Sequence, residues 1–240
     1  DRLKAARTTI AYQFGPIDPH EILLTSCATE SNNTAIFGTL KANANRKHII
    51  TTAVEHPAVY EVCKDIERLG YRVTYLPVDR QGRLDMGDYV RALDDDTLLV
   101  SIMHANNETG VVFPVEQLAR LTKETDPAIL SHTDATQSVG KLPLDLDGEF
   151  QHVDLLSFSG HKLHAPKGIG ALYIKRGTPC RPFMIGGHQE GGRRGGTENV
   201  PYIVGLAKAV SLAAENHDED ETRVRNMRDR LESTLAERIS

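Results

Sequence analysis

The chain has 240 residues, a net charge of −5 and an isoelectric point near 6.1, with 40% hydrophobic and 25% charged residues. This composition is typical of one large globular domain and excludes a disordered or fibrous protein. The acidic charge offers no basic surface for nucleic acid, and no apolar run approaches the roughly 20 residues that a membrane helix needs. Three scattered cysteines indicate neither a disulfide framework nor a zinc site, so we expect a reducing, cytoplasmic location and no bound metal.

The first part of the chain predicts a helix, a strand and a second helix. Residues 1–14 are typical of a helix end, and residues 21–25 form a short apolar strand. The turn that follows, residues 26–33, is rich in small polar residues and runs into a helix. A helix N-terminus presents free backbone N–H groups, so this turn is a candidate phosphate site, although a lone threonine such as Thr29 is more often an N-cap, a role that does not exclude phosphate.

The middle of the chain repeats the alternation. The predicted strands cover residues 48–53, 72–78 and 97–103, and the predicted helices cover residues 58–69, 86–93 and 114–123. His56 follows the first of these strands and Asn107 follows the last. Ligands of α/β proteins bind at such strand ends, whereas a lone histidine or asparagine there is usually a turn residue.

The last part predicts four further strands, at residues 128–134, 154–159, 169–175 and 181–185, and helices from residue 198 onward. Asp134 ends the first strand, where it either caps the next helix or stays ionised beside a cationic ring nitrogen. Lys162 follows the second strand, where lost hydration would lower its pKa and favour a Schiff base. The glycine-rich residues 186–199 carry two arginines and Thr197, and they form either a flexible loop or an anion site.

This alternation predicts an α/β fold with a mainly parallel, doubly wound sheet flanked by helices. The strand ends then share one edge. Pyridoxal 5'-phosphate needs a helix start for its phosphate, a lysine for its aldehyde and a carboxylate for its ring nitrogen, and this set of residues supplies all three. The residues expected at that edge are Thr29, His56, Asn107, Asp134, Gln137 and Lys162.

Six motifs together resemble those of the cysteine desulfurases, which are class V, fold-type I pyridoxal-phosphate enzymes; the nitrogen-fixation branch is the most similar. The motifs are TSCATESNN (25–33), EHP (55–57), MHANNETG (103–110), DATQSVGK (134–141), SFSGHK (157–162) and RGGTEN (194–199). The resemblance covers nearly the whole chain. It implies a large cofactor-binding domain at residues 1–217, without the family's opening segment, and a helix at residues 218–240 that leads to an absent small domain.

The resemblance also implies roles for single residues. Lys162 would form the Schiff base with the cofactor, and His56 would stack on the ring and move protons, so these two are the expected catalytic residues. Asp134 would pair with the ring nitrogen, Gln137 would bond the phenolic oxygen, and Asn107 would lie near the substrate carboxylate. The expected cofactor-binding set is completed by Ala28, Thr29, Ser159, Gly160 and His161 around the phosphate, and by Thr197 from the second subunit of a homodimer.

The implied activity converts L-cysteine to L-alanine and passes sulfur, as an enzyme persulfide, to an iron–sulfur scaffold or another acceptor. The family's catalytic cysteine and its substrate-binding arginine fall beyond residue 240, so we expect this chain to be inactive alone. Cys27 lies in the phosphate turn, Cys63 in a helix, and Cys180 has no motif around it. Two alternatives are a related class V enzyme, such as a selenocysteine lyase or an aminotransferase, and an inactive cofactor-binding or dimerisation fragment.

Overall fold

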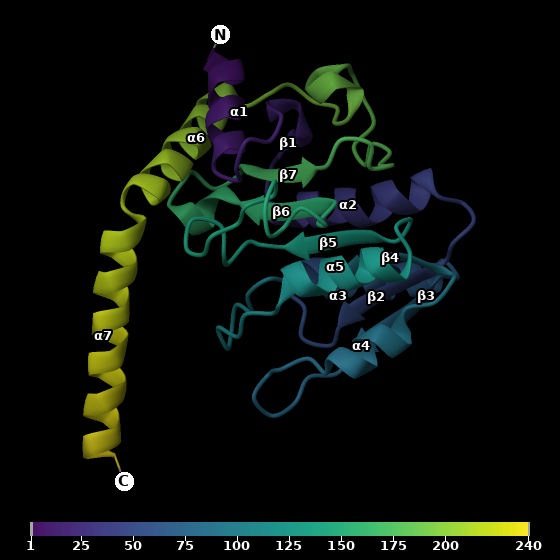
Figure 1. Cartoon of the computed structure of the whole chain (residues 1–240). Coiled ribbons are helices and arrows are strands. Elements are labelled where there is room, and N and C mark those ends of the chain that lie inside the picture. The colour runs from purple at the N-terminus through teal and green to yellow at the C-terminus, as the bar shows by residue number, and fades with distance from the viewer. Residues whose placement is uncertain (1, 240) are drawn as a thin grey trace.

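The computed structural model describes residues 2–239 and contains a seven-stranded sheet with helices on both faces (Figure 1). The strand order is β1-β7-β6-β5-β4-β2-β3. Strands β2 to β6 pair in parallel, whereas β7 is antiparallel to both β1 and β6. The predicted α/β fold with a mainly parallel sheet is therefore confirmed. The strands are β1 (Ile22–Thr25), β2 (His48–Thr52), β3 (Arg72–Leu76), β4 (Thr97–Ser101), β5 (Leu130–Asp134), β6 (Leu155–Ser159) and β7 (Gly170–Ile174).

Two hydrophobic cores lie on opposite faces of this sheet. One core packs beneath α2 and α3, and the other packs beneath α1, α4, α5 and α6. Helix α3 illustrates how a helix buries one face against the sheet. Its apolar residues recur at helical spacing and are all buried: Val59, Val62, Cys63 and Ile66. The helices are α1 (Arg2–Tyr12), α2 (Ala28–Ala42), α3 (Pro57–Arg68), α4 (Met86–Ala92), α5 (Val115–Thr125), α6 (Val200–Glu215) and α7 (His217–Arg238), with 3-10 turns η1 (Pro19–Glu21), η2 (Gly160–Leu163) and η3 (Gln189–Gly192).

The strand predicted at residues 181–185 is wrong, because the structure has no strand there. Pro182 lies within this segment and lacks the N–H group that a sheet ladder needs. The segment instead packs on α2: the Phe183 ring stacks on Phe37 at 5.8 Å, and the Arg181 N–H donates to the Gly38 carbonyl. The helix expected from residue 198 begins at Val200, with the Asn199 side chain as its cap.

Helix α7 projects away from the body of the molecule (Figure 1). None of its residues is buried. Its apolar residues Val224, Met227, Leu231 and Leu235 are all exposed and recur at a spacing that places them on one side of the helix. Within residues 2–239, no helix is long and apolar enough to cross a membrane.

Candidate cofactor site

A cavity of about 350 Å³ opens where the carboxyl ends of β1, β2, β4, β5 and β6 meet. The chain turns outward at each of these ends, so side chains that are distant in sequence converge there. The cavity is also lined by residues that were not predicted to bind the cofactor: Cys27, Ala58, Met103, Ala105 and Thr136. The structure brings nine of the expected residues to the cavity: Ala28, Thr29, His56, Asn107, Asp134, Gln137, Ser159, His161 and Lys162.

One end of the cavity is the N-terminus of α2. Cys27 occupies the N-cap position and its side chain makes no capping hydrogen bond, so Thr29 is not the N-cap. The first N–H groups of a helix have no intrahelical partner and favour an anion. Gly170 on β7 allows the turn at Cys27 to pack closely against the sheet, because a Cβ atom at position 170 would lie 2.8 Å from the Cys27 carbonyl carbon. The phosphate turn is thus held against the sheet by backbone packing.

Ser159 and His161 form a bonded pair at the same end. The Ser159 hydroxyl lies 2.8 Å from His161 Nδ1. Burial lowers the pKa of His161, and the charges of Lys162 and Lys167 lower it further, so the ring is neutral at pH 7. With the Ser159 hydroxyl as donor to Nδ1, the proton of the neutral ring resides on Nε2. This pair therefore offers a hydrogen-bond donor with a fixed orientation.

Lys162 lies in η2, directly after β6. Within residues 2–239 its amine makes neither a hydrogen bond nor an ion pair, and it borders the cavity. The Lys162 charge also affects Lys141: burial lowers the pKa of Lys141, and the Lys162 charge lowers it further. His164 ends η2 in the left-handed conformation, at φ 62°, and its N–H donates to the Gly160 carbonyl. The lysine is therefore held by a tight turn that leaves its amine available.

Asp134 is the buried acid of the site. Its Oδ1 accepts the Thr136 N–H at 2.9 Å, and its Oδ2 accepts the Asn32 side-chain amide at 2.7 Å. Residues 136–141 form turns and no helix, so Asp134 is not a helix cap. No local sequence signal predicts this bond, because Asn32 and Asp134 are 102 positions apart.

The buried His132 on β5 contacts side chains of both neighbouring strands, β4 and β6. His132 Nδ1 lies 2.8 Å from the Ser101 hydroxyl on β4, and Nε2 lies 2.9 Å from the Ser157 hydroxyl on β6. Burial lowers the pKa of His132 to about 4, so the ring is neutral at pH 7. The strands that carry the acid and the lysine are thus joined by side chains as well as by the ladder.

His56 is oriented by the start of α3. Its Nδ1 accepts the Ala58 N–H at 3.1 Å, which leaves Nε2 as the protonated nitrogen of a neutral ring. The adjacent Glu55 is buried, and its Oε1 accepts the Thr52 hydroxyl at 2.8 Å and the Met103 N–H at 3.0 Å. Burial raises the pKa of Glu55 to about 8, so this carboxyl is mainly protonated at pH 7. Glu55 therefore joins the ends of β2 and β4 as a mainly neutral group.

The two adjacent asparagines have different positions. Asn106 is buried and builds the turn: its amide donates to the Val54 carbonyl, and its Oδ1 accepts the N–H groups of Glu108 and Thr109. Asn107 is exposed and borders the cavity. Asn106 therefore holds the loop that presents Asn107.

Gly160 and Thr197 do not line the cavity. A Cβ atom on Gly160 would lie 3.0 to 3.1 Å from the side chains of Ile169, Leu206 and Ala165, so packing accounts for a glycine there. Thr197 is exposed in the glycine-rich loop. The cavity within one chain is therefore formed without these two residues.

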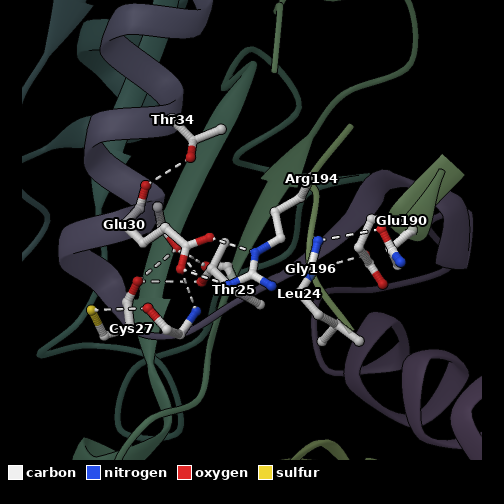
Figure 2. A network of polar contacts seen from close by, with 12 residues as sticks. Leu24, Thr25, Cys27, Glu30, Thr34, Glu190, Arg194 and Gly196 are labelled. Atoms are coloured by element: carbon white, nitrogen blue, oxygen red, sulfur yellow. Dashed lines mark hydrogen bonds and ion pairs between the residues drawn. The ribbon is translucent and has the colours of Figure 1, made fainter. Parts of the chain in front are cut away.

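Two ion pairs anchor the glycine-rich loop, and Figure 2 shows the pair between Glu30 and Arg194. Arg194 Nε donates to Glu30 Oε1 on α2 at 2.8 Å. Glu190 Oε2 accepts the Arg7 Nη1 group on α1 at 2.8 Å and the Leu24 N–H on β1 at 2.9 Å. Both carboxylates are more than nine-tenths buried. Arg194 therefore pairs with a carboxylate inside the protein, and the loop is a fixed element.

A larger hollow of about 840 Å³ lies on another side of Lys162, between η2 and the helices α6 and α7. Leu163, Leu212 and Val224 contribute apolar surface to it, and Arg225 and Arg228 contribute charge. It is a groove beneath a projecting helix and lacks the acid and the helix N-terminus of the smaller cavity.

The smaller cavity suits the cofactor that the sequence resemblance implies. An open helix N-terminus and the Ser159–His161 pair favour a phosphate, a buried acid favours a cationic ring nitrogen, and the unbonded Lys162 amine can react with an aldehyde. The Thr136 hydroxyl at the cavity is buried and has no partner among residues 2–239, so it can bond a polar group that enters the cavity.

Comparisons with known proteins agree with this chemistry. The family model of the class-V aminotransferases matches residues 1–240. A curated cysteine desulfurase of Gluconacetobacter diazotrophicus is 54% identical over 238 residues, which are 99% of this chain and 58% of the relative. A solved NifS-like protein superposes with a TM-score of 0.95 at 42% identity, over 98% of this chain and 64% of that one. A structure described as SspA in complex with cysteine gives 0.82 at 42% identity, over 88% and 60%. The chain thus spans somewhat over half the length of these proteins.

Proposed function

The chain belongs to the class-V aminotransferase family, and we propose from this premise that its cavity is the pyridoxal-phosphate site of a cysteine desulfurase. The observation that supports this most is the convergence of three groups in one cavity: the Lys162 amine, the Asp134 carboxylate and the N-terminus of α2. When bound, the cofactor supplies an electron sink for a substrate carbanion. No nucleic acid or membrane partner is proposed.

Each proposed role follows from a position at the cavity. The Lys162 amine would hold the cofactor through its aldehyde and, when free, would be the base that accepts the substrate's α-proton. The His56 ring would lie against the cofactor ring and would carry a proton at Nε2, because Nδ1 already accepts the Ala58 N–H. Gln137 bonds the ring's phenolic oxygen, and Asn107 lies towards the substrate carboxylate.

We propose L-cysteine as the substrate and L-alanine as the product. The desulfurase relative and the cysteine-bound neighbour support this choice, and the sulfur acceptor that fits such chemistry is an iron–sulfur scaffold, as in nitrogen fixation. We also propose a cytoplasmic homodimer, in which Thr197 of one chain completes the phosphate site of the other. The anchored glycine-rich loop supports this role, because it presents Thr197 at the surface on a fixed backbone.

Two of the three thiols are unsuited to accept sulfur. Burial raises the pKa of Cys63 to about 12 and that of Cys180 to about 11, so neither is a thiolate at pH 7. Cys27 borders the cavity at its phosphate end, away from the substrate. We therefore propose that the 240-residue chain binds the cofactor but does not release sulfide alone, with residues 1–217 as the cofactor-binding domain and residues 218–240 as a link to a smaller domain.

The test is the visible absorbance of the purified chain with added pyridoxal phosphate, followed by borohydride reduction and peptide mapping. We expect a yellow band and a reduced adduct on Lys162. The Lys162→Ala variant should lose the band, whereas Lys141→Ala, which removes a nearby lysine outside the cavity, should keep it. A protein that stays colourless, or an adduct on Lys141, would contradict the proposal.

Product analysis separates the two alternatives. The measurement uses a full-length protein that contains this chain. If it converts L-cysteine to alanine and sulfide, the desulfurase is supported. If it forms alanine from selenocysteine but not from cysteine, or if it exchanges amino groups, a related class V enzyme is supported. Cofactor retention without any half-reaction supports a binding or dimerisation module.

A further inference from the structure

We infer that Asn32 is a positioning residue that holds the Asp134 carboxylate in place for the cofactor ring, so that α2 sets both ends of the site. The inference rests on the proposed function, because it assigns a role towards the cofactor. Its basis is a contact within the chain: the Asn32 amide Nδ2 donates to Asp134 Oδ2 at 2.7 Å.

The contact is deeply buried. The Asn32 side chain has no exposed surface, and Asp134 is 6% exposed. A hydrogen bond between a neutral donor and a carboxylate is stronger than one between neutral groups, and burial shields it from water. The second Asp134 oxygen accepts the Thr136 N–H, so each oxygen has one fixed donor. Two donors on two oxygens fix the plane of the carboxylate.

Only the amide group of the Asn32 side chain is hydrogen-bonded. Its Oδ1 is buried and has no partner among residues 2–239. An unpaired buried acceptor destabilises a protein, and the bond from the Asn32 amide to the buried Asp134 carboxylate offsets that cost. The bond to Asp134 is therefore the contact that makes an amide side chain suitable at this position.

The position of Asn32 on α2 links the Asp134 carboxylate to the phosphate end of the cavity. Thr29, in the first turn of α2, lines the phosphate end of the cavity. Asn32 lies three residues later, which is about 4.5 Å further along the helix. One rigid helix therefore fixes the separation between the phosphate anchor and the acid that meets the ring nitrogen.

The other titratable groups around Asp134 do not compete for this role at neutral pH. The Glu55 carboxyl and the His132 ring both interact electrostatically with Asp134. Burial raises the pKa of Glu55 to about 8 and lowers that of His132 to about 4, so the neutral form predominates for both at pH 7. Asp134 is thus the acid that can meet a cationic ring nitrogen.

The test measures two properties of the cofactor-loaded chain, the dissociation constant of pyridoxal phosphate and the pH midpoint of the yellow band. For Asn32→Leu, we expect the dissociation constant to rise about tenfold. We also expect the pH midpoint of the yellow band to move upward by about half a pH unit. Without the Asn32 bond, the ring nitrogen of the cofactor should lose its proton more readily. An uncharged ring nitrogen repels the positive charge on the nitrogen that Lys162 contributes less than a protonated one does. Neither change follows from a loss of stability alone.

Three comparisons make the test decisive. Asn43→Ala removes a side-chain amide that donates to the Thr39 carbonyl within the same helix, and it should change neither property. Asn32→Ala serves if the leucine variant does not fold. In an Asp134→Asn background, Asn32→Ala should have almost no further effect, because the partner it acts through is gone.

The outcomes separate the inference from the function on which it rests. If the wild-type chain stays colourless with the cofactor, the proposed function fails and the inference fails with it. If the wild type binds but Asn32→Leu and Asn32→Ala match Asn43→Ala in both properties, the inference alone is overturned. Equal effects of Asn32→Ala in the wild-type and Asp134→Asn backgrounds would also overturn it.

Discussion

Helices α2 and α7 differ in how far they are buried in the rest of the protein. Helix α2 has 15 residues and buries ten of them, including the polar residues Glu30, Ser31 and Asn32. Helix α7 has 22 residues and buries none. The stability of α2 comes from tertiary contacts, whereas the ion pairs of α7, such as Glu221–Arg225, join residues of the same exposed helix.

The difference shows where polar residues carry information about function. On α2, three buried polar side chains of the first turns have distant partners: Glu30 pairs with Arg194, Ser31 bonds the Ala171 carbonyl, and Asn32 bonds Asp134. On α7 the ion pairs join neighbours on an exposed surface, where such pairs contribute little. Substitutions on the two helices should therefore differ sharply in effect.

The largest difference is expected for apolar residues. Ile36→Ala on α2 leaves a cavity in a fully buried position, so the free energy of unfolding should fall by about 3 to 4 kcal/mol. Leu235→Ala on α7 removes an exposed side chain and should leave it unchanged within error. Urea denaturation of both variants measures this, and equal losses would show that α7 is packed in solution.

The second largest is expected for ion pairs. Arg194→Ala leaves the Glu30 carboxylate buried without its cation, and the free energy of unfolding should fall by about 3 kcal/mol. Burial alone would raise the pKa of Glu30, but hydrogen bonds from Arg194 and Ser26 lower it below the usual value. This stabilisation is present above the usual carboxyl pKa and is lost on acidification, so the variant and the wild type should converge in acid.

The matched control on α7 is Arg225→Ala, which breaks the exposed pair with Glu221. It should cause no measurable change in urea denaturation at pH 7. A loss like that of Arg194→Ala would contradict the distinction between the two helices.

A smaller, pH-dependent effect is expected for Glu55. Its pKa is raised by burial to about 8, so the folded protein holds a proton that the unfolded chain releases above about pH 4.5. The wild type should therefore lose stability as the pH rises from about 4.5 to about 8. Glu55→Gln keeps a neutral side chain and should gain about 2 kcal/mol relative to wild type over this range. Thermal unfolding across pH measures it, with Glu232→Gln on α7 as the control that should show no such slope.

The smallest effect is expected for a charge placed on α7. Leu231 is 60% exposed, so Leu231→Lys buries no charge and should change the free energy of unfolding by less than about 0.5 kcal/mol. Amide exchange should agree, with fast exchange along α7 and slow exchange along α2. Slow exchange on α7 would indicate that the helix is covered in solution.

The order of strands and helices was predictable because each element carries its own periodicity. Strands such as β4 and β6 are mostly apolar and buried at every position, as expected of strands that are covered on both faces. The segment 181–185 was predicted wrongly for the same reason: its apolar residues have strand-like composition, but Pro182 and contacts with α2 decide its path. Local pattern cannot reveal a competing distant contact.

By itself, the sequence determined the α/β alternation and the set of polar residues at the strand ends, because these depend on neighbours in the chain. Tertiary structure alone decided which polar residues meet. Asn32 bonds Asp134 across 102 positions, and Glu190 pairs with Arg7 across 183. Neither pair leaves a local signal, because a hydrogen bond depends on distance in space and its partners can come from any part of the chain.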